Sequence, residues 1–201
     1  MRPYYEHAGI TIYHGDSREV LSVVGPIDLV FTDPPYPNAA GHFLDGLAAA
    51  EYVLQTYTAR RWLVFWHQLT RPPVSLPLVA HHIWHRTNTN RPDNYEPIYE
   101  FADEPERPSV VFPFAVVHPG LTGCTEATGH PTQKPVRLIQ RLLSMRPGNA
   151  VVDPFAGSGT TLVAAKALGR RAIGIEIEER YCEIAARRLS QEVFSFGGGT
   201  P

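Results

Sequence analysis

The chain has 201 residues, a formal net charge of −2 at pH 7, and a composition that is 43% hydrophobic and 19% charged. These values are typical of one soluble globular domain. No apolar run approaches the roughly eighteen residues of a membrane helix, and the N-terminus has no apolar export segment, so we expect a cytoplasmic protein without membrane contact. Cys124 and Cys182 are too few for a disulfide framework, and neither has a metal-ligand spacing.

Apolar periodicity predicts an alternation of strands and helices. In the first part of the chain we expect a strand at 10–16, a strand at 27–32, a helix at 45–57, and strands at 62–66, 79–84 and 97–101. In the last part we expect a helix at 135–145, a strand at 150–153, a helix at 158–168, a strand at 172–177 and a helix at 179–189. The sequence between them, 103–128, is rich in Pro, Gly and Thr and predicts a loop with one short strand near 110–114.

This order of elements predicts an α/β fold with a single doubly wound, mostly parallel sheet. We expect one domain over 1–195, with 103–128 as an inserted recognition element and 196–201 as a flexible tail.

A glycine-rich turn, Asp153-Pro-Phe-Ala-Gly-Ser-Gly-Thr-Thr161, lies between a predicted strand and a predicted helix. Glycines in such a turn let backbone N–H groups approach a ligand, and the helix N-terminus adds partial positive charge. No lysine follows Gly159, so a phosphate-binding loop is a poor match, and Leu162 occupies the place of the third glycine of a dinucleotide site. Glu176, at the end of the next strand, could accept both hydroxyls of a ribose.

The tetrapeptide Asp33-Pro34-Pro35-Tyr36 follows a predicted buried strand, so it lies at the carboxyl edge of the sheet, where ligands bind. Because prolines have no N–H, the strand ends there and leaves a rigid finger. The finger suits a planar ring that carries an amine: Asp33 and the Pro34 carbonyl would accept its two N–H bonds, and Tyr36 would stack on the ring. A strand end that serves only as a turn is the alternative interpretation.

Together these motifs resemble those of the DNA amino-methyltransferases, which methylate adenine N6 or cytosine N4. The catalytic motif precedes the cofactor motif, as in the beta-type order of that family. His130-Pro-Thr-Gln-Lys-Pro135 and Ile12-Tyr-His-Gly-Asp16 are similar to two further family segments. The resemblance covers about 8–102 and 129–190. It implies a circularly permuted, Rossmann-like methyltransferase fold in which the strand before Asp153 lies beside the strand before Asp33.

The resemblance also implies the site residues. The catalytic residues would be Asp33, Pro34, Pro35 and Tyr36. S-adenosylmethionine would be held by Asp16, Thr132, Lys134, Asp153, Phe155, Gly157, Ser158, Gly159, Thr160 and Glu176. Among these, Asp16 would lie near the adenine, and Thr132 and Lys134 would face the methionine carboxylate. No metal is required, and the spacing of His81, His82 and His85 on a strand disfavours one.

We therefore expect a site-specific DNA methyltransferase that acts on adenine N6 in double-stranded DNA by base flipping and direct transfer. Cytosine-N4 methylation is the alternative, although members with that activity usually carry Ser at the position of Asp33. A catalytically silent cofactor- or DNA-binding subunit is an alternative from another class. A net charge of −2 requires that any DNA-binding face gather its positive charge locally.

Most members of this family have a longer recognition region than 103–128 provides. The recognised DNA sequence would then be short or loosely defined, or its recognition would be shared with a second subunit such as another copy in a homodimer. Both a restriction-modification role and a stand-alone role are compatible with the sequence.

Overall fold

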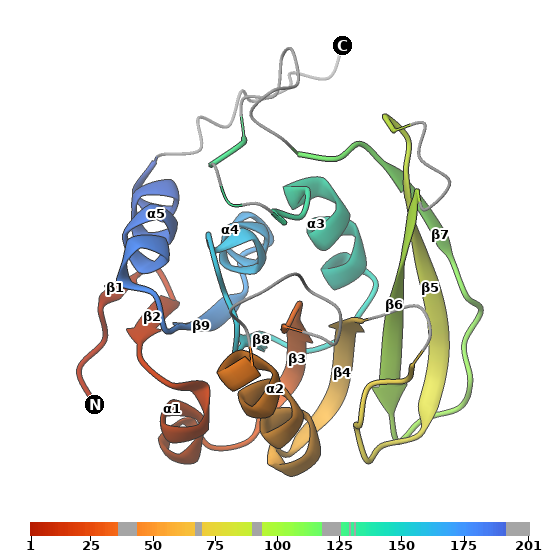
Figure 1. Cartoon of the computed structure of the whole chain (residues 1–201), viewed down its shortest axis with the longest axis horizontal. Helices are drawn as coiled ribbons and strands as arrows, with labels where there is room; N and C mark the ends of the chain where they lie inside the picture. Colours follow the sequence, from red (N-terminus) through yellow and green to blue (C-terminus); the bar gives the residue numbers. More distant parts are fainter. Residues whose placement is uncertain are drawn as a thin grey trace.

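The computed structural model describes residues 1–35, 44–66, 70–89, 94–117, 126–128, 130 and 132–191. In these residues, strands and helices alternate along much of the chain, except that strands follow one another without a helix in residues 5–14 and 59–114 (Figure 1). The elements are β1 Tyr5–His7, β2 Ile10–His14, α1 Ser17–Val24, β3 Ile27–Thr32, α2 Leu44–Thr56, β4 Ala59–Phe65, β5 Leu78–Arg86, β6 Tyr95–Ala102, β7 Val111–Phe114, α3 Val136–Ser144, β8 Ala150–Asp153, α4 Thr160–Ala167, β9 Arg171–Glu176 and α5 Glu179–Ser190.

The described strands form a single nine-stranded sheet in the order β1-β2-β9-β8-β3-β4-β6-β5-β7. The five strands from β2 to β4 in this order are all parallel to one another. On either side of them, β1 runs antiparallel to β2, and β6 runs antiparallel to both β4 and β5. The prediction of a doubly wound, mostly parallel α/β sheet is confirmed.

Helices cover both faces of the sheet, because side chains of successive strand residues point to opposite faces. Leu29 and Phe31 of β3 pack in the core that α3, α4 and α5 cover, whereas Val30 packs in the core that α1 and α2 cover. Figure 1 shows the same division of the helices between the two faces. The central strands therefore contain runs of buried apolar residues, such as Leu29 to Phe31 of β3, as expected for parallel strands buried on both sides.

Two short elements were not predicted, namely α1 and β1. Asp16 caps α1, since its carboxylate accepts a hydrogen bond of 2.8 Å from the backbone N–H of Arg18. The buried residues Val20 and Leu21 hold the helix against the sheet. With only eight residues, α1 has too few turns for a clear helical period in the sequence.

A buried ionic cluster joins the antiparallel strands to the loop after α3. The Glu100 carboxylate, on β6, is fully buried and binds Arg61 of β4 and Arg146 of the loop. His82 of β5 lies 3.0 Å from the same carboxylate through Nε2, while its Nδ1 accepts from the Val110 N–H. The same nitrogen, Nε2, also lies 2.8 Å from the Arg146 guanidinium, so His82 belongs to the cluster on both sides of its ring.

Candidate active site

The two acidic strand ends that the sequence singled out lie side by side. β3 ends before Asp33 and β8 ends at Asp153, and these strands are parallel neighbours, with Val30 opposite Val152. The adjacency predicted for them is confirmed. The chain then continues into α2 on one face of the sheet and into α4 on the other, so the two strand ends flank a topological switch point. Such points form ligand-binding crevices in open α/β sheets.

The glycine turn between β8 and α4 lies close to its neighbours. Gly157 and Gly159 have φ values of +51° and +78°, in the left-handed region. A Cβ on Gly157 would lie 3.1 Å from Nε2 of His130. The N–H of Gly157 donates to the Glu176 carboxylate at 2.8 Å. Small residues are therefore needed here both for the backbone conformation and for the space.

The substitution Gly159→Ala is expected to lower the free energy of unfolding by about 2–4 kcal/mol, because it combines backbone strain with a steric clash. Its Cβ would lie 2.7 Å from the Cβ of Ala185 on α5. Gly169→Ala is the matched control, since Gly169 has φ +67° and a Cβ there would meet no atom within 4 Å. Urea denaturation gives the free energy of unfolding of both variants. Both share the backbone strain, so the difference between them measures the steric clash at Gly159. Equal losses in the two would contradict the packing explanation.

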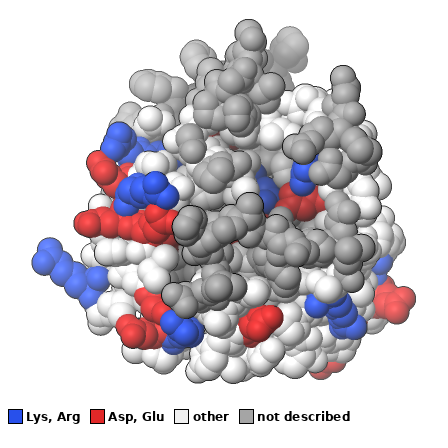
Figure 2. All heavy atoms as spheres, in the orientation of Figure 1, with Lys and Arg blue, Asp and Glu red and all other residues white. Residues whose placement is uncertain are grey.

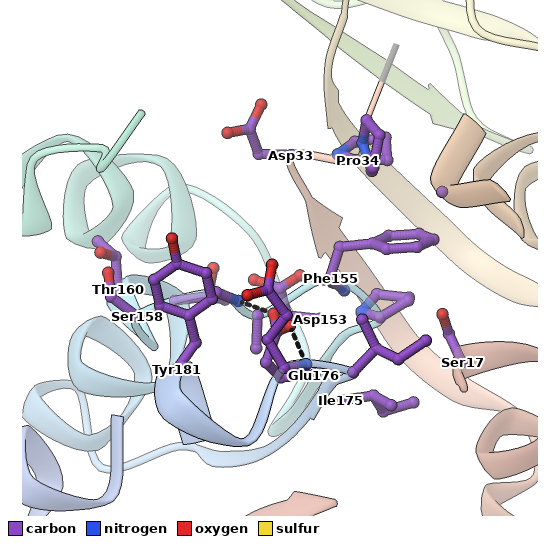
Figure 3. A pocket seen from close by; sticks show the side chains of 18 of the residues that line it. Ser17, Asp33, Pro34, Asp153, Phe155, Ser158, Thr160, Ile175, Glu176 and Tyr181 are labelled. Carbon is purple, nitrogen blue, oxygen red and sulfur yellow. Dashed lines mark hydrogen bonds between the residues drawn. The ribbon is translucent and has the colours of Figure 1, made fainter. Parts of the chain in front are cut away.

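Glu176 ends β9 and points into the cavity (Figure 3). Its two carboxylate oxygens accept backbone hydrogen bonds of 2.8 Å from Gly157 and Glu178. Burial raises the pKa of this carboxyl, and the backbone donors oppose the shift. Since each carboxylate oxygen has two acceptor sites, Glu176 keeps capacity for ligand hydroxyls while the glycine turn holds it in place.

Asp153 and Asp33 have elevated pKa values for the same main reason. Burial, together with the nearby Asp33, raises the pKa of Asp153 to about 7, although hydrogen bonds from Thr161 and from the Phe155 N–H oppose the shift. Burial likewise raises the pKa of Asp33 to about 6, although the Lys134 ammonium lowers it. Carboxyl groups that have shifted pKa values and lie together in one cleft are typical of functional sites.

Lys134 precedes α3 and connects the finger to the antiparallel strands. Its Nζ donates to Oδ2 of Asp33 at 2.5 Å and lies 3.2 Å from Oε1 of Glu96 on β6. The ammonium also lies 4.9 Å from the centre of the Phe65 ring. The expectation for Lys134, a contact with the methionine carboxylate, stays a prediction; the structure adds this ion pair with Asp33.

One cavity of about 540 Å³ brings these groups together. Asp33 and Pro34 lie on one side of it, and Glu176 and Asp153 lie on the other (Figure 3). Of the predicted site residues, the cavity is lined by Asp16, Asp33, Pro34, Pro35, Thr132, Lys134, Asp153, Phe155, Gly157, Ser158, Thr160 and Glu176. Gly159 does not line it but begins α4 as its N-cap. Tyr36 lies outside the described residues.

Among the residues near the site that the sequence did not single out as site residues are His130, Tyr181 and Glu96. His130 and Tyr181 line the cavity, with ring centres 4.6 Å apart. Burial, together with the Lys134 charge, lowers the pKa of His130 to about 4, so the ring is neutral at neutral pH. His130 belongs to the His-Pro-Thr-Gln-Lys-Pro segment, so that motif was the available signal. Tyr181 and Glu96 stand in ordinary helix and strand patterns.

The three histidines of β5 have separate partners. His81 stacks on Tyr99, His82 binds Glu100, and His85 contacts Asn94. Within the described ranges, no group of three or more His, Cys, Asp or Glu side chains is arranged to hold a metal ion. Across the same ranges, no helix combines the length and apolar character that a membrane span requires.

The fold and the site define an α/β protein whose cofactor crevice lies between acidic strand ends and a glycine turn. The family model described as DNA methylase matches residues 80–187, more than half of the chain. The chain therefore belongs to this family of adenine-N6 and cytosine-N4 DNA methylases, and the family predicted from the motifs is confirmed.

Two relatives are type II methyltransferases. The chain is 28% identical to M2.LlaDCHI of Lactococcus lactis subsp. cremoris over 255 aligned positions, which include 94% of this chain and 93% of the relative. It is 27% identical to M2.DpnII of Streptococcus pneumoniae over 256 positions, with 95% and 93% covered. Both alignments are longer than the 201 residues of this chain, so the relatives carry additional residues inside the matched region.

Solved structures show the same fold. The M1.HpyAVI–SAM complex matches with a TM-score of 0.69 at 24% identity, covering 90% of this chain and 100% of that one. The cytosine-N4-specific PvuII DNA methyltransferase matches with a TM-score of 0.70 at 18% identity, covering 96% and 91%. These two neighbours support a methyltransferase fold and leave the target base open.

Proposed function

We propose that the chain is a DNA methyltransferase that transfers a methyl group from S-adenosylmethionine to N6 of adenine in double-stranded DNA. The observation that carries the proposal is the placement of Asp33 and Pro34 across one cavity from Glu176 and the glycine turn. A methyl acceptor bound at the first pair would face a donor bound at the second. Membership of the DNA methylase family supports DNA as the substrate.

The cavity fits the proposed methyl donor. Its volume of about 540 Å³ is within the range of small-molecule sites, roughly 300–1,000 Å³. It combines a carboxylate at a strand end for ribose hydroxyls, an aromatic side chain at Phe155, and a glycine turn that a Cβ at Gly157 would crowd. When bound, S-adenosylmethionine supplies an electrophilic methyl group on a positively charged sulfur.

We assign the cofactor contacts as follows. Glu176 accepts the ribose hydroxyls, and Phe155 and Asp16 border the adenine. Asp153 and the turn from Gly157 through Gly159, with Ser158 and Thr160, border the methionine part; Thr132 and Lys134 face its carboxylate. The carboxylates at Asp33 and Asp153, when ionised, favour a cationic donor between them.

The acceptor side positions the target amine. Within the described residues, Lys134 occupies only Oδ2 of Asp33, and no hydrogen bond reaches Oδ1 or the Pro34 carbonyl. These two oxygens accept the two N–H bonds of the amine and turn its lone pair toward the methyl group. Once methylated, the nitrogen is acidic, and Asp33, with its pKa of about 6, accepts the released proton and passes it to water.

The base must leave the DNA helix to reach this finger, because a stacked base cannot enter a cavity at a strand end. We propose that Tyr36 stacks on the flipped base, a contact worth about 1–3 kcal/mol. We also propose that 103–128 contributes to recognition; within it, β7 forms the outer strand of the sheet beside β5. On the face in Figure 2, described basic and acidic side chains are intermixed, so a basic DNA-binding face stays a prediction.

Cytosine-N4 methylation is the second candidate. A cytosine amine presents the same two N–H bonds to Asp33 and Pro34, and the similar PvuII structure is of a cytosine-N4-specific enzyme. Asp33 favours adenine, because family members that act on cytosine usually carry Ser there.

The test is to incubate the protein with S-adenosylmethionine and unmethylated duplex DNA, digest the DNA to nucleosides, and analyse them by mass spectrometry. N6-methyladenine is the expected product. N4-methylcytosine would replace the adenine assignment and keep the mechanism. If neither base appears, on duplex or single-stranded DNA, while the protein still binds the cofactor, the silent-subunit alternative is favoured.

A further inference from the structure

A row of four side chains with alternating charge runs along one face of the sheet to the site. Arg86 at the end of β5 donates to Oε2 of Glu96 at 3.0 Å. The other oxygen, Oε1, lies 3.2 Å from the Lys134 ammonium, which binds Asp33. Glu96 and Lys134 have side chains only 6% and 9% exposed, so water screens their interaction weakly.

The backbone explains why these groups meet. Glu96 is the second residue of β6 and lies directly opposite Trp84, so it is at the same edge of the sheet as the end of β5 and the end of β3. It shares a face of β6 with Ile98, which packs in the core that α3 covers. Lys134 reaches the same face from the segment before α3. Glu96 therefore supplies a buried negative charge beside the Lys134 ammonium.

We propose that Glu96 is a positioning residue for methyl transfer: it holds the Lys134 ammonium on Oδ2 of Asp33 and thereby directs Oδ1 toward the target amine. This inference rests on the proposed function of Asp33. Removing the Glu96 carboxylate takes away the negative charge that Oε1 places 3.2 Å from the ammonium, so Lys134 no longer fixes the rotation of Asp33 in the same way. Catalysis depends strongly on the orientation of the groups that hold the substrate, so a loosened Asp33 carboxylate should slow methyl transfer.

The charges around Asp33 predict two shifts of opposite sign. The groups that face it are Lys134 from the segment before α3, Glu96 from β6, Arg86 from β5 and Asp153 from β8. After burial, Lys134 lowers the pKa of Asp33 and Glu96 raises it. Removing the Glu96 charge should therefore lower this pKa, and removing the Lys134 charge should raise it. A general loss of structure would not produce opposite shifts.

The first arm of the test needs no catalysis. The carboxyl of Asp33 is titrated by NMR in protein with ¹³C-labelled aspartate, and Asp33→Asn identifies its signal. We expect Glu96→Gln to lower the pKa by roughly 0.5–1 unit and Lys134→Met to raise it by about 1 unit or more. Glu183→Gln, which removes one exposed ion pair on α5 with Arg187, is the control and should leave it unchanged. Shifts of the same sign, or no shift in Glu96→Gln, would overturn the proposal.

The second arm measures methyl transfer. Glu96→Gln should lower kcat by about tenfold and leave cofactor affinity within about twofold, because Glu96 acts on orientation rather than on binding. An unchanged kcat, or a loss confined to cofactor affinity, would also contradict a positioning role. If the wild-type protein methylates no base, the proposed function fails, whereas the titration still decides whether Glu96 and Lys134 control Asp33.

Discussion

Asp33→Asn is expected to reduce methyl transfer by about 10³-fold while cofactor affinity stays within about threefold of wild type. The amide has one acceptor oxygen and no negative charge, so it can neither bind Lys134 as an ion pair nor accept the proton that the methylated amine releases. Because Asp33 lies across the cavity from Glu176, the variant should still bind S-adenosylmethionine at the Glu176 side of the cavity. Single-turnover transfer of labelled methyl to DNA, with a separate cofactor titration, checks both parts.

Asp28→Asn is the matched control, because Asp28 lies near the other end of β3 and does not line the cavity. It should transfer methyl at a rate close to that of wild type. The wild-type rate should also fall as the pH drops below about 6, since the pKa of Asp33 is raised to about 6 and only the ionised form pairs with Lys134 and can take up the proton that the methylated amine releases. An Asp33→Asn rate within tenfold of wild type would show that Asp33 is not the central acceptor.

Glu100→Gln is expected to lower the free energy of unfolding by about 3–5 kcal/mol at neutral pH. Glu100 is the shared carboxylate of Arg61, Arg146 and His82, and it is fully buried. Its removal leaves two arginines with side chains 4% and 3% exposed and without that anion. Urea denaturation measures the loss. Glu104→Gln removes a partner of the same Arg61, but Glu104 is 41% exposed, so that control should lose less than about 1 kcal/mol.

The same cluster predicts a pH dependence. Burial alone would raise the pKa of Glu100, but hydrogen bonds from His82 and Arg146 lower it to about 2 from a reference of 4.5. A carboxyl with a depressed pKa stabilises the fold above its unfolded-state value and loses that contribution as the pH falls toward its folded-state value. The stability difference between wild type and Glu100→Gln should therefore shrink between pH 4.5 and 2. A constant difference over this range would contradict the ionic explanation.

The sequence predicts the parallel part of the fold well, because each of those strands is a short apolar run with a clear boundary. β3 ends before two prolines, and β8 ends at a glycine turn. The sequence does not predict the antiparallel direction of β6, since a run of apolar residues is compatible with either strand direction. β1 was missed because it has only three residues and is largely exposed.

The site shows a similar division. Residues within contiguous motifs, such as Asp33 and Glu176, could be proposed from the sequence because backbone geometry places a strand end at a predictable edge. The sequence did not single out Glu96 and Glu100, although it predicted the strand β6 that carries them. Both face α3 from a strand that is buried on both sides, and their charges are balanced by residues distant in sequence. Only the tertiary structure brings Lys134 and Arg146 to them.

The outer strand β7 has a consequence for self-association. The carbonyls of Val110 and Phe114 accept hydrogen bonds from Ile83 and Thr87, so the residues between them alternate, and the nitrogen of Pro113 faces away from β5. Proline has no N–H to offer an incoming strand. At the opposite end of the sheet, β1 is only three residues long. Both ends are thus poor templates for aggregation through added strands, and any pairing of two copies should use helices or loops instead.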